Sequence, residues 1–212
     1  MEWKLPAQSH VAKNIPKNTF FSRTKVNTKL KNSLTHTLQK IIWEYKLSPE
    51  TIGIPKTNTV EEIQIFTLYL KKYLIPKDIL TLIDKTIPYP ILFVGIYEQH
   101  TFFAISLKPK GQDRWYISEW DKHPNFSFSG THLEKVYENI VRAFLTLPHP
   151  KDDIHREFAI LIEEDAQKKR LTKEIQALEN KIRTERQFKK KVELNIQLQD
   201  KKKELKNPEI KS

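Results

Sequence analysis

The residues of this chain whose types and spacing could do chemistry are the acidic and amide side chains of Glu61-Glu62-Ile63-Gln64. On a β-strand, Glu62 and Gln64 would point to the same face because side chains alternate. Restriction-type nucleases hold a divalent metal with such a Glu-x-Gln or Glu-x-Lys strand and a further acidic residue upstream. Residues 1–60 contain no Asp, so Glu44, expected on the preceding helix, would have to supply that carboxylate. A metal-dependent nuclease site of Glu62, Gln64 and Glu44 is one hypothesis; a polar sheet face is the interpretation that we favour.

Other catalytic patterns are missing from the sequence. It has no Gly-rich phosphate loop, no HExxH and no GxSxG. It also has no cysteine, which excludes disulfides, thiolate metal sites and a cysteine nucleophile. His149 and His155 flank two aspartates, but a solvated linker explains them better than a metal site. We therefore expect no catalytic residue, no metal and no cofactor.

The charge of the chain is uneven. The net charge is +11, and the excess lies in two blocks, residues 1–48 and 168–191, on either side of a neutral middle. Such blocks favour a polyanionic partner, and DNA phosphate is the one that we consider. The candidate phosphate ligands are Lys13, Lys17, Arg23, Lys25, Lys29 and Lys31 in the first block, and Lys189, Lys190 and Lys191 in the second.

A group of aromatic residues follows the middle of the chain. Trp115, Tyr116 and Trp120, with Arg114 and Lys122 beside them, could stack nucleobases. On a strand, Trp115 would lie on one face, and Tyr116 and Trp120 on the other. One set must then line the core, and a protein-partner surface is the more common use of the other.

Hydrophobic spacing predicts an α+β domain. Three- and four-residue spacing indicates helices at 27–46, 76–87 and 132–147, while β-branched and aromatic runs indicate strands at 60–70, 91–97, 101–108 and 114–120. The order predicts a mainly antiparallel sheet of about four strands with helices on one face. We expect residues 1–28 to form a basic, irregular arm that packs on a domain of residues 29–147.

Glycine and proline are absent from residues 151–206, so a long helical tail is expected after a linker at 148–153. The tail would span residues 154–206, with residues 207–212 frayed. A heptad seam predicts one helix or a coiled coil that forms a homo- or hetero-oligomer. Phe188 and Leu194 fall off this seam, so a break near 184–188 and a helical hairpin remain an alternative. The residues expected at the partner interface are Leu171, Ile175, Leu178, Ile182, Val192 and Ile196.

The sequence contains no stretch typical of a transmembrane helix, and its N-terminus does not resemble a signal peptide. No apolar run reaches 18 residues, and the first ten residues lack the apolar core of a signal peptide. We therefore expect a cytoplasmic protein without a membrane partner.

The stretch from Ile15 to about Phe144 resembles a bacterial domain-of-unknown-function family, the one numbered 4391. The similar segments are Ile15–Lys17, Trp43–Ile52, Val60–Ile65, Ile87–Ile91 and Leu133–Glu138. The resemblance implies a small accessory protein encoded near DNA methyltransferases and large helicases in restriction-like anti-phage islands. It brings no established catalytic residue.

Together these observations favour a non-catalytic accessory subunit of an anti-phage complex. It would dock on a helicase or DNA methyltransferase and touch DNA phosphates without reading bases. The alternatives are the metal-dependent nuclease and a structural adaptor that makes no contact with nucleic acid.

Overall fold

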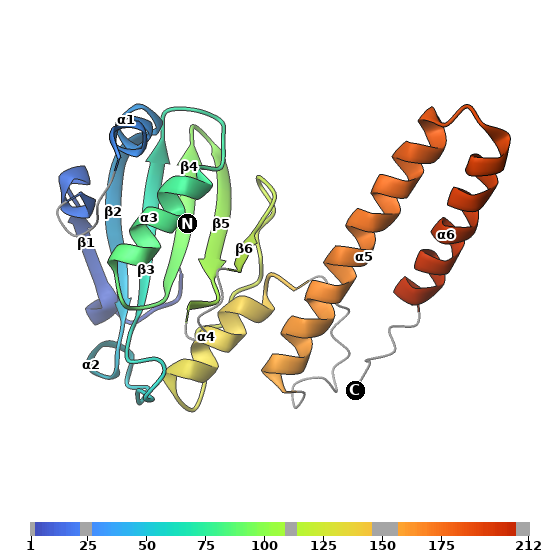
Figure 1. Cartoon of the computed structure of the whole chain (residues 1–212). Coiled ribbons are helices and arrows are strands. Elements are labelled where there is room, and N and C mark those ends of the chain that lie inside the picture. The colour runs from blue at the N-terminus through green and yellow to red at the C-terminus, as the bar shows by residue number, and fades with distance from the viewer. Residues whose placement is uncertain (1–2, 22–26, 109–113, 146–156, 207–212) are drawn as a thin grey trace. The chain divides into compact units, whose positions relative to one another are not determined.

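The structure is a computed structural model of the 212-residue chain, and it describes residues 3–21, 27–108, 114–145 and 157–206 (Figure 1). The chain divides into two compact units, residues 1–144 and 145–212. The expected linker at 148–153 and the expected frayed end at 207–212 lie outside the described residues. The first unit is an α+β fold, as the spacing of apolar residues predicted.

A six-stranded sheet forms the first unit, rather than the four strands expected. The strands follow one another across the sheet in chain order. All neighbours are antiparallel except β3 and β4, which are parallel because a helix crosses over between them. The strands are β1 (His10–Asn14), β2 (Leu38–Leu47), β3 (Ile63–Leu70), β4 (Ile91–Tyr97), β5 (His100–Ser106) and β6 (Trp115–Ile117).

The helices of this unit are short. The crossover helix is α3 (Lys77–Thr86), within the helix expected at 76–87, and α4 (Leu133–Arg142) lies within the helix expected at 132–147. Helix α2 ends at Gly53, whose φ of 69° is left-handed and suits glycine. The other helical segments are α1 (Thr28–Thr37), α2 (Pro49–Ile52) and two 3₁₀ turns, η1 (Ala7–Ser9) and η2 (Lys17–Phe20).

The expected helix at 27–46 was wrong beyond Thr37. Helix α1 begins at the predicted cap, where the Asn27 side chain accepts a hydrogen bond from the Leu30 amide, but the chain then becomes β2. Residues 41–45 contain two isoleucines, a tryptophan and a tyrosine, which fit a pleated surface better than a helix. Backbone pairing with both β1 and β3 overrides the helical spacing.

The N-terminal arm, expected to be irregular, contains a strand. Strand β1 extends the sheet by pairing with β2, and its register shifts between His10 and Lys13. Ala12 lies within that shift and has a φ of 51°. Phe20 is buried and belongs to the same core cluster as Leu34 and Phe66.

Apolar side chains cover both faces of the sheet. One face packs against α1 and α3 in a core that includes Leu34, Phe66, Ile79 and Phe93. On the other face, alternate strand residues such as Phe103 and Tyr116 are buried too. Their rings contact Phe126 and Phe144, which precede and follow α4 in the chain. The sequence analysis expected helices on one face of the sheet alone. That expectation holds for α1 and α3, but the other face is covered as well.

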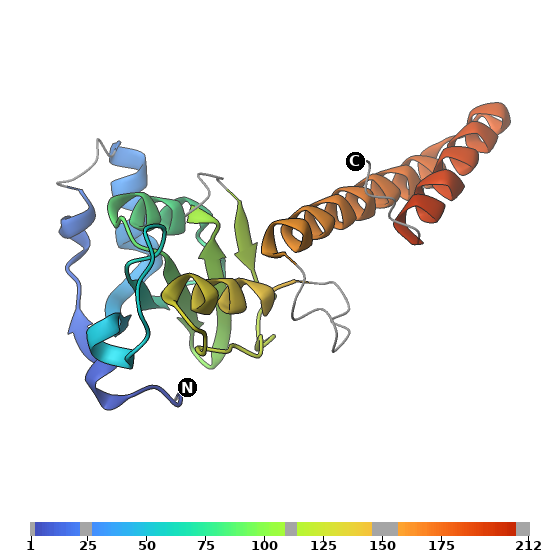
Figure 2. The ribbon, with the colours of Figure 1, turned by 90° about the horizontal axis from the view of Figure 1, so that it is seen from below.

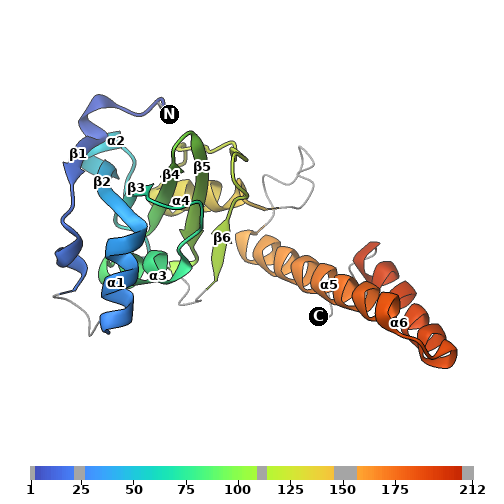
Figure 3. The same cartoon turned by 90° about the horizontal axis from the view of Figure 1, so that it is seen from above.

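The second unit is a helical hairpin. Helix α5 (Phe158–Thr184) and helix α6 (Phe188–Lys206) pack together, and the three residues between them turn the chain back (Figures 2 and 3). The break lies at 185–187, inside the interval predicted from the slip of the heptad seam. The hairpin alternative is thus confirmed. Among the described helices, none is long and apolar enough to cross a membrane.

Candidate functional site

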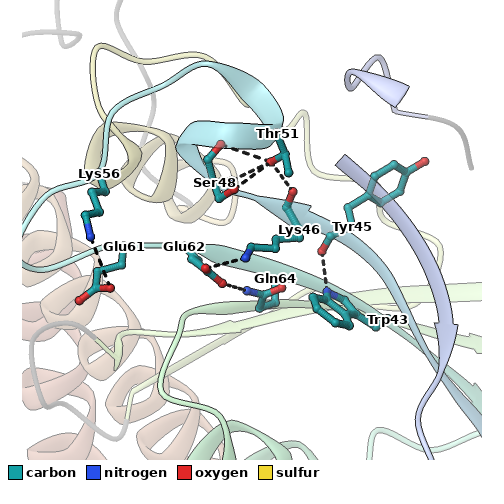
Figure 4. A network of polar contacts seen from close by, with 9 residues as sticks. All are labelled: Trp43, Tyr45, Lys46, Ser48, Thr51, Lys56, Glu61, Glu62 and Gln64. Atoms are coloured by element: carbon teal, nitrogen blue, oxygen red, sulfur yellow. Dashed lines mark hydrogen bonds and ion pairs between the residues drawn. The ribbon is translucent and has the colours of Figure 1, made fainter. Parts of the chain in front are cut away.

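The structure brings Glu62 and Gln64 together, although Glu62 lies just before β3 rather than on the strand expected at 60–70 (Figure 4). The Gln64 amide nitrogen donates to Glu62 Oε2 at 2.9 Å. Lys46 lies opposite Gln64 in the β2–β3 register, and its ammonium is 2.7 Å from Glu62 Oε1. Both carboxylate oxygens of Glu62 therefore have partners. Lys46, Glu62 and Gln64 link β2 to the start of β3, and we call these three residues the clasp.

Helix α2 adds charge and hydrogen bonds beside this clasp. The Thr51 hydroxyl donates to the Lys46 carbonyl at 2.7 Å and accepts from the Ser48 amide at 2.9 Å. These two hydrogen bonds attach α2 to the end of β2. A hydrogen bond with the Ser48 side chain lowers the pKa of the exposed Glu50. The hydrogen bond to Glu62 raises the pKa of Lys46, so its ammonium form is favoured.

Gln64 has an unusual environment. The residue is 3% exposed, and among the described residues its side-chain oxygen has no hydrogen-bond partner. A buried amide oxygen without a partner costs free energy, so a donor or a cation at this position would be stabilising. Among the polar side-chain atoms of Lys46, Glu62 and Gln64, this buried oxygen is the one without a partner in the described part of the chain.

Glu44 does not join the clasp. It lies on β2 rather than on a helix, at a shift in register between Trp43 and Tyr45. Its carboxylate faces His10 on β1 at 3.8 Å. Within the described ranges, no three His, Asp or Glu side chains gather as a metal ion would require. A metal at Glu62 would have to displace the Lys46 ammonium.

The first basic block is only partly free to bind phosphate. Lys17 donates to the Leu38 carbonyl at 2.5 Å, and burial, with a smaller effect from Lys71, lowers its pKa. The Lys31 ammonium lies 5.6 Å from the centre of the Phe21 ring. Lys13 on β1 and Lys29 on α1 are exposed, whereas Arg23 and Lys25 lie outside the described residues.

The second basic block lies at the turn of the hairpin, which we call the hairpin tip (residues 181–191). All three predicted lysines, Lys189–Lys191, are exposed there at the start of α6. The tip holds six Lys and Arg residues and a single acidic residue, Glu185. Glu185 accepts a hydrogen bond from the Gln187 amide at 2.8 Å, which lowers the pKa of its carboxyl. An open groove of about 650 Å³ lies at the tip, lined in part by Lys181, Arg186 and Lys190.

Four of the six residues expected at a partner interface are used inside the hairpin. Leu171, Ile175, Leu178 and Ile182 form one stripe of α5. Two ion pairs cross between the helices, Glu174 with Lys201 at 2.9 Å and Glu179 with Lys202 at 2.8 Å. These pairs orient the stripe toward α6, where Leu198 is buried.

Val192 and Ile196, the other two expected interface residues, remain exposed at 42% and 58%. Phe188 continues the same side of α6 at a spacing of four residues and is 81% exposed. We call these three residues the outer stripe. Phe188 was not expected at the interface because it falls off the heptad seam that includes Val192 and Ile196.

Comparison with known proteins gives a family and no further relative. The family model described as Domain of unknown function (DUF4391) matches residues 3–205. The match covers the sheet and both hairpin helices, so it extends beyond the similar stretch from Ile15 to about Phe144. No curated protein matches the chain, and no solved structure does.

Proposed function

Because the chain belongs to the family described as Domain of unknown function (DUF4391), which supplies no activity to transfer, we propose its function from its own surfaces. The chain is a non-catalytic accessory subunit of a DNA-directed complex. Its hairpin tip contacts DNA phosphates without reading bases, and its outer stripe binds a helix of a partner subunit. The single observation that carries this proposal is the concentration of exposed positive charge at the tip.

Physical arguments support phosphate binding at the tip. Six cationic side chains within eleven residues attract a polyanion, and the only carboxylate among them is already hydrogen-bonded to the backbone. The first amides of α6 lie at the same place, and a helix N-terminus favours negative charge. Long, flexible lysines suit phosphate oxygens as point charges, whereas base readout needs side chains fixed in a groove.

The outer stripe supports a protein partner. Phe188, Val192 and Ile196 present three apolar side chains on successive turns, which is the pattern of a helix-in-groove or helix-pairing contact. Lys203 beside the stripe is paired with Asp200 at 4.0 Å, so the apolar side chains rather than charge define the complementary partner as an amphipathic helix. We propose that this partner is a helicase or DNA methyltransferase subunit of an anti-phage system in the cytoplasm.

Charge reversal at the tip tests the phosphate contact. Duplex DNA of two unrelated sequences is titrated with the purified protein and with the variant K189E/K190E/K191E at low salt. We expect the variant to bind both sequences more weakly and by the same factor. The matched control is K173E/K203E/K206E, which makes the same change in charge at exposed lysines of the hairpin outside the tip. Equal weakening in both variants would mean that net charge alone matters.

A second experiment tests the partner. The native complex is captured from cells that carry either the wild-type chain or V192D/I196D. We expect the partner subunit to be lost from the variant, because two carboxylates would be buried in an apolar contact. The control N180D/Q197D adds the same charge at exposed polar positions of the hairpin and should retain the partner. Retention by both variants would contradict the outer stripe as the contact.

One observation favours the nuclease as a second candidate. The Gln64 amide nitrogen is hydrogen-bonded to Glu62, while the Gln64 oxygen has no partner among the described residues. Carboxylate and amide oxygens are ligands of the kind that Mg²⁺ prefers. This candidate predicts Mg²⁺-dependent cleavage that disappears in Glu62→Ala while DNA binding survives. Absence of DNA affinity and of cleavage in both the isolated protein and its complex would leave the structural adaptor.

A further inference from the structure

Four aromatic side chains from distant parts of the sequence meet on the surface of the first unit. They are Tyr73, between β3 and α3, Tyr97 and His100, at the β4–β5 turn, and Trp120, after β6. Tyr73 and Trp120 are stacked, with ring centroids 4.5 Å apart and planes 20° from parallel. The Tyr73 ring meets His100 edge-on at 5.2 Å and Tyr97 at 6.0 Å. We call this group the aromatic platform.

The platform is open to solvent above and supported from below. Tyr73 is 54% exposed, and with Leu74 it is one of two large exposed hydrophobic residues among those described in residues 1–144. Below it, Trp120 packs edge-on against Phe102 at 5.0 Å, and Phe102 is fully buried. Trp120 therefore has a fixed position, and Tyr73 lies on it with much of its ring in water.

A strained residue holds the adjoining histidine in place. Asp121 has a φ of 61°, which is uncommon for a residue with a Cβ atom. In this conformation its carboxylate accepts from the Thr101 amide at 3.0 Å and lies 2.7 Å from His100 Nδ1. Backbone strain of this kind persists where the surrounding structure fixes it, and such residues cluster at binding sites.

We propose that the aromatic platform binds an unpaired nucleobase of a single-stranded nucleic acid, stacked on the ring of Tyr73. Bases stack on exposed aromatic rings regardless of their identity because each has a π-face. Lys72 and Lys122 are exposed and adjoin the platform in sequence, so they can meet the flanking phosphates. Exposed Glu98 and Glu119 offset these lysines, so stacking rather than phosphate attraction supplies the affinity.

This binding site goes beyond the proposed function, since it uses the first unit and unpaired bases rather than the hairpin tip and duplex phosphates. The two are separable by experiment. The variant K189E/K190E/K191E should lose duplex affinity and still prefer an oligonucleotide that has bases over one that has none.

The test compares a labelled dT12 oligonucleotide with an abasic 12-mer of the same phosphate count, by fluorescence anisotropy with the full chain. We expect dT12 to bind more tightly. Tyr73→Ala should weaken dT12 binding by roughly tenfold and leave the abasic 12-mer unchanged, because one stacking contact is lost. Tyr73→Phe should keep the preference for dT12, and Leu74→Ala, at the exposed neighbour, should change neither oligonucleotide.

A crosslinking experiment locates the contact independently of affinity. A dT12 that carries one 5-iodouracil is irradiated with the wild-type chain, and we expect the crosslinked peptide to contain Tyr73 or Trp120. Equal affinity of the wild type for dT12 and the abasic 12-mer would overturn the proposal. So would crosslinks confined to other peptides, or Tyr73→Ala weakening both oligonucleotides equally. Binding of a proline-rich peptide at the platform, with no preference for bases, would indicate a protein ligand instead.

Discussion

Gly95 on β4 is the position where one added methyl group should matter most. It lies opposite Phe102 on β5, and a Cβ atom there would be 1.9 Å from Phe102 Cε1. Carbon atoms in contact lie about 3.5–4.0 Å apart. The ring would therefore have to retreat by roughly 1.6 Å or more. Phe102 is fully buried and supports Trp120, so it has no room to do so. We expect Gly95→Ala to lower the free energy of unfolding by about 3 kcal/mol, at the upper end of overpacking costs.

A double-mutant cycle separates this clash from other causes. Phe102→Ala alone should cost about 3–5 kcal/mol through the lost ring and the cavity that it leaves. In that background Gly95→Ala meets no ring and should cost almost nothing, so the coupling between the two sites should be about 3 kcal/mol. Gly53→Ala is the control. An added methyl group at this position has no neighbour within 4 Å, but the Gly53 backbone has a φ of 69°. The substitution should therefore lower the free energy of unfolding by about 1 kcal/mol in either background.

Urea denaturation followed by tryptophan fluorescence measures these differences. All four tryptophans of the chain, Trp3, Trp43, Trp115 and Trp120, lie in residues 1–144, so the signal reports the first unit and not the hairpin. A Gly95→Ala cost below about 0.5 kcal/mol, or the same cost with and without the Phe102 ring, would refute the reasoning.

Three further predictions concern other parts of the chain. A hydrogen bond from His100, and then one from the Thr101 amide, lowers the pKa of Asp121 below its usual value. Its contribution to stability is therefore present above the unfolded-state pKa and is lost as the pH falls through the lowered value. Urea midpoints of the wild type and Asp121→Asn, which also tolerates the left-handed φ, should then differ at pH 7 and converge as the pH falls below the usual Asp pKa of 3.8; a constant difference would argue against it. In the hairpin, L178D/I182D should lower helicity in circular dichroism without changing the molar mass by light scattering, because these residues face α6; loss of an oligomer would instead assign them to an intermolecular contact. Limited proteolysis should leave a folded fragment of about 145 residues, matching the first compact unit, and equally rapid loss of both units would contradict the division.

Much of the fold follows from local pattern. The strands β3, β4 and β5 and the helix α3 are predicted because their apolar residues have a clear period and turn residues bound them. Strand β2 was misassigned because the leucines and isoleucines from Leu30 to Ile42 fit helical spacing as well, and only pairing with two neighbouring strands decides between them. Strand β1 is short, lies at the edge of the sheet and contains a shift in register. Its sequence therefore shows almost no alternation of apolar and polar residues, and the strand was not predicted.

In the candidate sites, too, some contacts follow from local sequence pattern and others depend on the tertiary structure. Glu62 and Gln64 are two residues apart, and strand geometry alone predicts that they meet. Lys46, their partner across the sheet, depends on a register that the sequence does not specify. The aromatic platform joins Tyr73 and Trp120, which are far apart in the chain. Trp120 was assigned to the same face as Tyr116, but β6 ends at Ile117 and Trp120 instead packs with Trp115 against the α1–α3 core.

The salt dependence of duplex DNA binding tests the central claim most directly. If Lys189, Lys190 and Lys191 each neutralise a phosphate, each releases counterions, with a slope of about −0.9 per contact in a plot of log K against log salt. The variant K189Q/K190Q/K191Q should therefore give a slope flatter than that of the wild type by roughly three units. The control K173Q/K203Q/K206Q should keep the wild-type slope. Identical slopes for the wild type and the tip variant, or binding that does not depend on salt, would contradict phosphate contact at the hairpin tip.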